Sequence, residues 1–133
     1  MARWLVKSDP DTYSFADLAR DRKTIWDGIA NAAALGHLRR MAKGDDCLVY
    51  ETGGVKAIVG YAKVASTPRA DPADPRLATV ELAAGKPAAR PLTLAAIKSD
   101  PAFAAWELVR ISRLSVMPVP EPIWQRVERL TRV

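Results

Sequence analysis

Residues 4–14 read WLVKSDPDTYS and residues 26–31 read WDGIAN. Together these two segments contain two tryptophans, a turn rich in charged residues and a turn with glycine, all within the first 31 residues. A Trp followed directly by Asp-Gly fits poorly inside a regular helix or strand, so we expect Trp26 to stand at the edge of an element. Its ring is then either a core residue capped by a turn or the wall of a pocket. The spacing alone favours the core.

Around this stretch, local patterns predict strands that alternate with short helices. Proline after the first apolar run ends a strand. Ser14 and Asp17 have the spacing of a capping box, and Asn31 and Thr93 are placed to cap later helices. We expect strands over residues 3–6, 46–50, 57–65, 77–83, 88–92 and 108–119, helices over 14–20, 32–41, a short stretch after 93 and 120–130, a hairpin turn at 53–54 and a loop over 67–75. This mixture indicates a small α+β, barrel-like domain.

Composition restricts the class of protein. With 133 residues, 49% of them hydrophobic and 26% charged, the chain is predicted to be one globular domain over residues 1–133. Its apolar runs are too short to span a bilayer, and residues 1–8 lack the apolar core of a signal peptide, so we expect no membrane association and a cytoplasmic location. Cys47, the one cysteine, is interpreted as a small core residue in a reducing compartment.

The charge leans mildly toward a polyanionic partner. Twenty Lys and Arg against 15 Asp and Glu give a net charge of +5. Most cations are spread along the chain, although Arg39, Arg40 and Lys43 form a local group. Arg126 and Arg129 recur at helical spacing, which is typical of a solvated helix face.

Catalytic and metal chemistry lack their usual residues. His37 is the only histidine, and together with Cys47 it cannot build a tetrahedral zinc site, so no metal is expected. The sequence contains no nucleophile elbow, phosphate-binding loop or dinucleotide fingerprint. The paired carboxylates Asp9 and Asp11 lie in a turn, where capping is the usual role. We therefore predict that the protein is not an enzyme and uses no cofactor.

Binding of an extruded base requires ring surfaces for stacking and a few hydrogen-bonding groups for the base edge. Trp26 and Tyr50 supply rings. Loop residues supply donors and acceptors: Lys7, Ser8, Asp9, Asn31 and Ser115. Spacing alone does not bring these residues together.

The order of the motifs resembles that of the EVE domain family, a branch of the PUA-like superfamily. WLVKSDP at 4–10 with YS at 13–14 resembles the family's W-L-x-K-S-E-P-x-x-Y-S, and WDGIAN resembles W-x-G-V-R-N. LRRM at 38–41 with KGD at 43–45 resembles L-R-x-M-x-x-G-D. VY at 49–50, IVG at 58–60 and RLSVMPV at 113–119, followed by Trp124, continue the series. The resemblance runs nearly end to end.

The resemblance implies a PUA-like mixed β pseudo-barrel with short flanking helices and a concave pocket for a modified base, most often a modified cytosine in DNA. By position, Trp26 lines the pocket, Lys7, Ser8 and Asp9 form a polar rim, and Tyr50 and Ser115 with Met117 close the opposite side. Asp9 keeps the charge of the family's glutamate, and a carboxylate accepts a hydrogen bond from the cytosine amine. The residues expected to meet the nucleic-acid backbone are Arg39, Arg40, Lys43 and Arg113.

Two differences from the family pattern leave other interpretations of the function open. Residues 30–36 read ANAAALG where the family often has R-N-Y-Q-A-R-N, and Glu51-Thr52 replaces a His-Ser pair. The type of modified base, the choice between DNA and RNA, and the oligomeric state stay open. The alternative is a regulatory protein that binds a small molecule or free nucleotide and contacts no polymer. A hydrolase in which Asp9 or Asp27 activates water ranks last, because an exposed carboxylate is a weak base.

Overall fold

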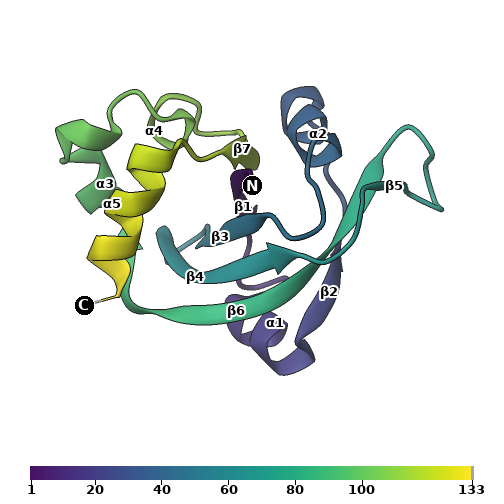
Figure 1. Cartoon of the computed structure of the whole chain (residues 1–133), viewed down its shortest axis with the longest axis horizontal. Helices are drawn as coiled ribbons and strands as arrows, with labels where there is room; N and C mark the ends of the chain where they lie inside the picture. The colour runs from purple at the N-terminus through teal and green to yellow at the C-terminus, as the bar shows by residue number, and fades with distance from the viewer. Residues whose placement is uncertain (133) are drawn as a thin grey trace.

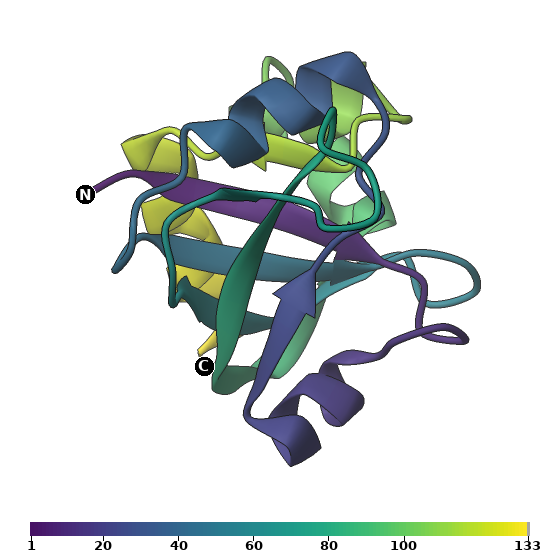
Figure 2. The same cartoon turned by 90° about the vertical axis from the view of Figure 1, so that its right-hand side faces the viewer.

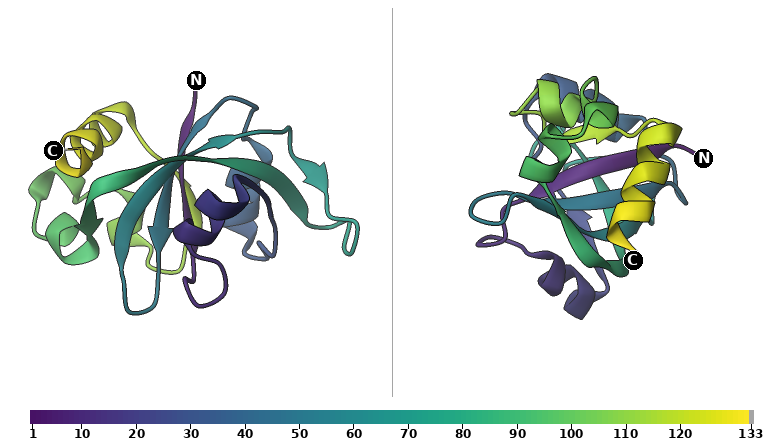
Figure 3. Two further views of the ribbon diagram at one scale, coloured as in Figure 1. Left: turned by 90° about the horizontal axis from the view of Figure 1, so that it is seen from below. Right: turned by 90° about the vertical axis from the view of Figure 1, so that its left-hand side faces the viewer.

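One long, bent strand organises the molecule, whose computed structural model describes residues 1–132 (Figure 1). This strand, β6 (Ala78–Thr93), pairs antiparallel with β2 (Lys23–Trp26) on one side and with β4 (Ala57–Val64) on the other. Register shifts beside Gly60 interrupt its pairing with β4. Such irregularities bend a strand and increase its twist, so β6 arches across the molecule (Figure 3).

The sheet follows the order β2-β6-β4-β3-β1-β7, and the two-residue β5 (Arg69–Ala70) pairs with β6 outside this path. Here β1 (Arg3–Ser8) runs parallel to β3 (Asp46–Glu51), and β7 (Val116–Pro118) runs antiparallel to β1. The curled sheet is a half-barrel with short helices around it. The predicted mixed α+β class with flanking helices is therefore confirmed.

Short helices cover the sheet from several sides. In Figure 2, α2 (Ala32–Arg39) lies above β1, and α1 (Phe15–Asp21) lies at the far end of the molecule. After β6 come α3 (Leu94–Lys98), the 3₁₀ turn η1 (Pro101–Phe103) and α4 (Glu107–Arg110), and α5 (Glu121–Thr131) closes the chain beside β6. Within residues 1–132, no helix has the length and apolar character needed to cross a membrane.

The predicted helix caps are confirmed. Ser14 Oγ accepts from the Asp17 N–H at 3.0 Å, and the Asp17 carboxylate accepts from the Ser14 N–H at 2.9 Å, which completes the capping box of α1. The side chains of Asn31 and Thr93 accept from the N–H groups of Ala34 and Ala96 at the starts of α2 and α3. These caps satisfy N–H groups that a helix leaves free.

Several predicted boundaries were wrong. Residues 23–26, for which no element was expected, form β2. The two strands predicted over 77–83 and 88–92 are one continuous strand, because Gly85 and Pro87 lie at the irregular part of the pairing with β4, where breaking residues are tolerated. The helix predicted over 32–41 ends at Arg39, and the loop predicted over 67–75 contains β5.

The largest correction concerns the strand predicted over residues 108–119. Residues 107–110 form α4, and only Val116–Pro118 join the sheet. Burial does not alternate along this stretch: Leu108 is buried, but residues 110–113 are all exposed in succession. Arg126 also departs from the predicted solvated face, because its guanidinium binds Asp100 at 2.6 Å and lies over the Phe103 ring.

The core explains how α1 is held against the sheet. Phe15, the first residue of α1, packs against Gly60 of β4, where a β-carbon would overlap its ring. The Phe15 N–H donates to the buried carboxylate of Glu51 at 2.8 Å. Cys47 is fully buried, as predicted for a small core residue. Docking of α1 fixes the loop between β1 and α1, which forms part of the site described next.

Candidate functional site

A cavity of about 600 Å³ opens where the ends of β1 and β2 meet the start of β7. Lys7 and Ser8 end β1, Trp26 ends β2, and Ser115 directly precedes β7. The Lys7 N–H donates to the Ser115 carbonyl at 2.9 Å, which holds two of these walls together. The structure thus brings together five of the predicted site residues: Lys7, Ser8, Asp9, Trp26 and Ser115.

The loop after β1 forms one wall of the cavity and is held by its own hydrogen bonds. The N–H groups of Thr12 and Tyr13 donate to the Asp9 carbonyl at 3.0 and 2.8 Å. The Asp9 carboxylate accepts from the Asp11 N–H at 2.9 Å, and the Ser8 hydroxyl donates to the Tyr13 carbonyl. These bonds fix Asp9 at the cavity while leaving it exposed to solvent.

Two aromatic rings line the cavity: Tyr13 comes from the loop after β1, and Trp26 comes from the end of β2. Trp26 and Tyr13 meet edge to face, with ring centroids 6.4 Å apart and planes at 81°. The Tyr13 hydroxyl donates to Asp21 at 2.9 Å, and burial raises the pKa of Tyr13, so its hydroxyl stays neutral at physiological pH. Gly28, with φ of +74°, turns the chain away after β2, and glycine adopts this conformation without strain.

Trp26 belongs both to the core and to the cavity. Its side chain is 7% exposed and packs within the main hydrophobic cluster, yet it lines the cavity. The two interpretations that the sequence left open therefore both apply to this residue. Its predicted place at the edge of an element is confirmed, because it is the last residue of β2.

The charge on the cavity walls is mixed. Lys7 is the only cation among the lining residues, whereas Asp9 and Asp27 both contribute carboxylates. Burial lowers the pKa of Lys7, and its ammonium donates to the Ser112 carbonyl at 2.8 Å. Ile25 places an apolar side chain, 59% exposed, at the rim. The walls therefore offer hydrogen-bond acceptors and apolar surface more than positive charge.

Three of the predicted binding residues lie outside this cavity. Tyr50 is 3% exposed and lines a neighbouring pocket, and Met117 is buried completely in the core. The Asn31 side chain caps α2. Conversely, the sequence analysis did not single out Tyr13, Thr24 and Ile25 as site residues, although Tyr13 belongs to the motif at the start of the chain.

The cations predicted for a nucleic-acid backbone occupy two separate places. Arg113 lies two residues before Ser115, beside the cavity. Arg40 and Lys43 follow α2 near the first residues of β1, where the Asp46 N–H binds the Ala2 carbonyl. Because the six residues of β1 span roughly 15–20 Å, this group lies at the other end of the strand from the cavity. Arg39 donates to the Arg76 carbonyl.

Within residues 1–132, the structure contains no group of three His, Cys, Asp or Glu arranged to hold a metal ion. The candidate site is the cavity itself.

Comparison with solved structures supports the family resemblance. Rpa0253 from Rhodopseudomonas palustris is 35% identical, with a TM-score of 0.94 over 98% of this chain and 93% of that one. Human THYN1, crystallised in complex with 5-methylcytosine containing DNA, is 21% identical, with a TM-score of 0.91 over 100% and 99% of the two chains. No curated protein sequence matches the chain significantly.

A more distant likeness concerns the fold alone. ASCH from Zymomonas mobilis is 14% identical, with a TM-score of 0.61 over 97% of this chain and 95% of that one, and shares the PUA-like half-barrel. At such identities the human and Zymomonas structures show the fold alone. The EVE domain family matches residues 2–130, nearly the whole chain, and this protein therefore belongs to the EVE domain family.

Proposed function

We propose that this protein is a non-catalytic nucleic-acid-binding domain that holds one modified base, foremost a modified cytosine of DNA, in the cavity between β1, β2 and β7. The observation that carries the proposal is the meeting of aromatic rings and carboxylates in one space of about 600 Å³. Human THYN1, which shares the fold, was crystallised in complex with 5-methylcytosine containing DNA. RNA is the second polymer that fits this chemistry.

The walls match the two requirements of an extruded base. Trp26 and Tyr13 give an aromatic surface against which a base ring packs, a contact worth about 1–3 kcal/mol per stacked base. Asp9 and Asp27 are carboxylates that accept from the exocyclic amine of cytosine. The cavity volume falls in the usual range for ligand pockets, roughly 300–1,000 Å³, so a base with an added substituent fits.

The phosphates of the same strand must be met outside the cavity, because its lining contains one lysine and two aspartates. Arg113 is the backbone contact that we assign next to the base, since it is two residues from Ser115. Arg39, Arg40 and Lys43 lie at the far end of β1 and reach only a longer strand. Arg113 is therefore the primary phosphate contact, and the three cations at the end of α2 are a secondary one.

A second candidate function has a specific observation in its favour. The excess of carboxylates over cations in the lining, with the α2 arginines at the other end of β1, fits a small molecule, or the base of a free nucleotide whose phosphate stays in solvent, with no polymer involved. Under this alternative the free ligand binds as tightly as the same group in an oligonucleotide.

A pair of neighbouring aspartates tests the base-binding proposal. Asp9 lines the cavity, whereas Asp11, two residues along the same loop, does not. We expect Asp9→Asn to weaken binding of an oligonucleotide with one 5-methylcytosine by up to roughly tenfold, because a neutral amide oxygen replaces the charged acceptor. Asp11→Asn should leave the affinity unchanged. Equal effects of the two substitutions, or none, would count against an acceptor role for Asp9.

A further inference from the structure

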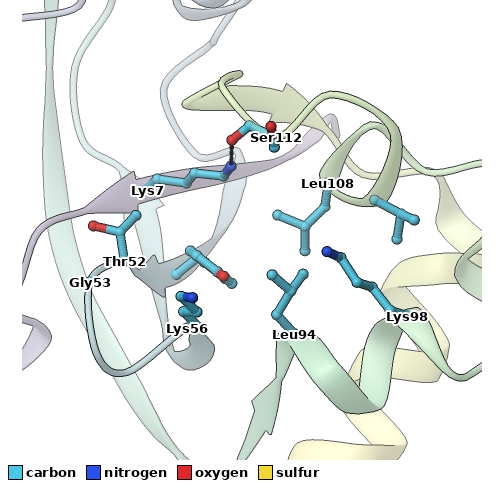
Figure 4. A pocket seen from close by; sticks show the side chains of 10 residues that line it. Lys7, Thr52, Gly53, Lys56, Leu94, Lys98, Leu108 and Ser112 are labelled. Carbon is cyan, nitrogen blue, oxygen red and sulfur yellow. Dashed lines mark hydrogen bonds between the residues drawn. The ribbon is translucent and has the colours of Figure 1, made fainter.

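A second pocket, of about 280 Å³, lies on the other side of Lys7, between β1, the turn before β4, and helices α3 and α4 (Figure 4). Three lysines from three different elements line it. Lys7 comes from β1, Lys56 directly precedes β4, and Lys98 is the last residue of α3. None of the lining residues is acidic. The pocket therefore differs in charge from the first cavity, which contains two carboxylates.

The positive charge of this pocket is not neutralised by the protein. Within residues 1–132, no carboxylate lies within salt-bridge distance of Lys7, Lys56 or Lys98, whereas Lys63 is paired with Asp46 at 2.7 Å. Lys7 uses one of its three N–H donors on the Ser112 carbonyl, at 2.8 Å. Its remaining donors are available to a ligand.

The Lys7 side chain is held by contacts of its own, whereas Lys56 and Lys98 are positioned through the backbone that carries them. The Lys7 ammonium lies 5.6 Å from the centroid of the Tyr50 ring, within range of a cation–π contact. Lys56 has a left-handed backbone, with φ of 49°, and its carbonyl accepts from the Leu94 N–H at 2.8 Å. This bond joins the turn before β4 to the start of α3, so Lys56 and Lys98 belong to one connected wall.

Besides the lysines and the polar residues Thr52 and Ser112, much of the lining is apolar. Tyr50, 3% exposed, is one of the lining residues and contributes an aromatic ring. Leu94 and Leu108 contribute aliphatic surface beside Lys98 (Figure 4). An inorganic ion alone would leave this surface unused. A ligand with an anionic group and a small organic body would contact both parts of the pocket.

We propose that this second pocket binds a phosphate group carried on a small organic body, as in a nucleoside monophosphate. A phosphate carries up to two negative charges and three acceptor oxygens, which suit several lysine point charges, whereas a lone carboxylate suits the planar fork of arginine. The phosphate comes either from a free phosphomonoester or from a strand whose neighbouring base occupies the first cavity, since Lys7 lines both. The inference does not require the base-binding function.

The test uses the full chain and two exposed lysines. In ¹H–¹⁵N NMR titrations, deoxycytidine 5′-monophosphate should shift the amides of Tyr50, Leu94 and Leu108, and deoxycytidine without phosphate should not. The double variant Lys56→Gln/Lys98→Gln should raise the Kd for the monophosphate roughly tenfold or more, because each lost charge-assisted hydrogen bond costs about a tenfold change. Lys86→Gln, an exposed lysine of another surface, should leave it unchanged. Equal melting temperatures establish that all variants fold.

Titration with an oligonucleotide distinguishes the two sources of phosphate. For a free phosphomonoester, the double variant weakens monophosphate binding and leaves oligonucleotide affinity intact. For a strand phosphate, it also weakens oligonucleotide binding and reduces the slope of log affinity against log salt by about two. The proposal is overturned if the double variant changes neither affinity, or if the monophosphate shifts only amides around Trp26. Oligonucleotide binding that is blind to base modification would contradict the first cavity's role and leave this pocket unaffected.

Discussion

Trp26 combines a structural and a binding role in one side chain. It is 7% exposed within the main hydrophobic cluster, and it also lines the cavity against Tyr13. We expect Trp26→Ala to lower the free energy of unfolding by about 3 kcal/mol, the usual cost of truncating a buried aromatic side chain. Trp26→Phe keeps most of the apolar contact and should fold well, while it weakens ligand binding by changing the wall. Thermal melts and oligonucleotide titrations of both variants measure the two effects separately.

Trp106 provides the matched control. It is 1% exposed, and its indole N–H donates to the Pro118 carbonyl at 3.2 Å, away from the cavity. Trp106→Phe should reduce stability and leave the affinity of the folded protein unchanged. If Trp26→Phe binds with wild-type affinity, Trp26 is a core residue only.

The sequence could place Trp26 but not decide between its two roles. Asp27 and Gly28 after it predict the edge of an element, and this is confirmed. Whether the ring faces the core or a cavity depends on the pairing of β2 with β6, whose partner residues lie more than 50 positions further along the chain. Local sequence patterns contain no information about that pairing.

Helix α1 is held to the sheet through one glycine. A β-carbon on Gly60 would overlap the Phe15 ring, which is 7% exposed and packed in the core. We expect Gly60→Ala to lower the free energy of unfolding by about 1–3 kcal/mol, as for other overpacked core sites. Gly36 lies within α2, with no neighbour within 4 Å of an added β-carbon, so Gly36→Ala should be neutral or stabilising by up to about 1 kcal/mol. Chemical denaturation measures both, and a neutral Gly60→Ala would show that the Phe15 ring moves aside without cost.

The contact between η1 and α5 should make stability depend on acidity. Arg126 donates to the Asp100 carboxylate at 2.6 Å, and the Ala102 N–H donates to the same group at 3.0 Å, so the Asp100 pKa lies below its ordinary value of 3.8. A lowered pKa stabilises the folded state above the ordinary value, and this stabilisation is lost as the pH falls through the folded-state pKa. Asp100→Asn should therefore flatten the fall in melting temperature below about pH 4. An unchanged acid profile would contradict the contact.

At the scale of elements, short-range signals were more reliable than composition. The caps at Ser14, Asn31 and Thr93 depend on residues three positions apart, and all three are confirmed. The stretch over 108–119 was predicted as a strand because it is rich in Leu, Ile and Val. Leu108 of α4 instead faces a pocket that Leu94 of α3 also lines, an arrangement set by the tertiary fold, so composition gave the wrong element there.

The positions of the arginines predict that the effect of substituting them depends on the length of the bound oligonucleotide. With a short single-stranded oligonucleotide, Arg113→Gln should reduce the slope of log affinity against log salt by about one. Arg39→Glu with Arg40→Glu should weaken binding and flatten its salt dependence only when the strand is long enough to reach both ends of β1. Fluorescence anisotropy at several salt concentrations, with strands of two lengths, measures this. An equal loss at both lengths would place the α2 arginines beside the base.

The architecture also explains how far the site could be predicted. The half-barrel and the residues Lys7, Ser8, Asp9, Trp26 and Ser115 follow from the family resemblance, and the structure places these residues around one cavity. Tyr50 lies on the other side of Lys7, because a parallel β1–β3 pairing puts Tyr50 beside Lys7 rather than beside Ser8. The resemblance had grouped Tyr50 with the residues of the first cavity. The register of β1 and β3, which the sequence does not specify, places it in the neighbouring pocket.

The central claim is that the cavity between β1, β2 and β7 accepts a modified base. The most direct test is a tryptophan-fluorescence titration with oligonucleotides that are identical except for one cytosine, which is unmodified, methylated or hydroxymethylated. We predict quenching and affinity that depend on the modification, with weaker quenching and weaker affinity in Trp26→Phe. Binding that is salt-sensitive but identical for all three cytosines would contradict the claim and leave only a weak binder of polyanions.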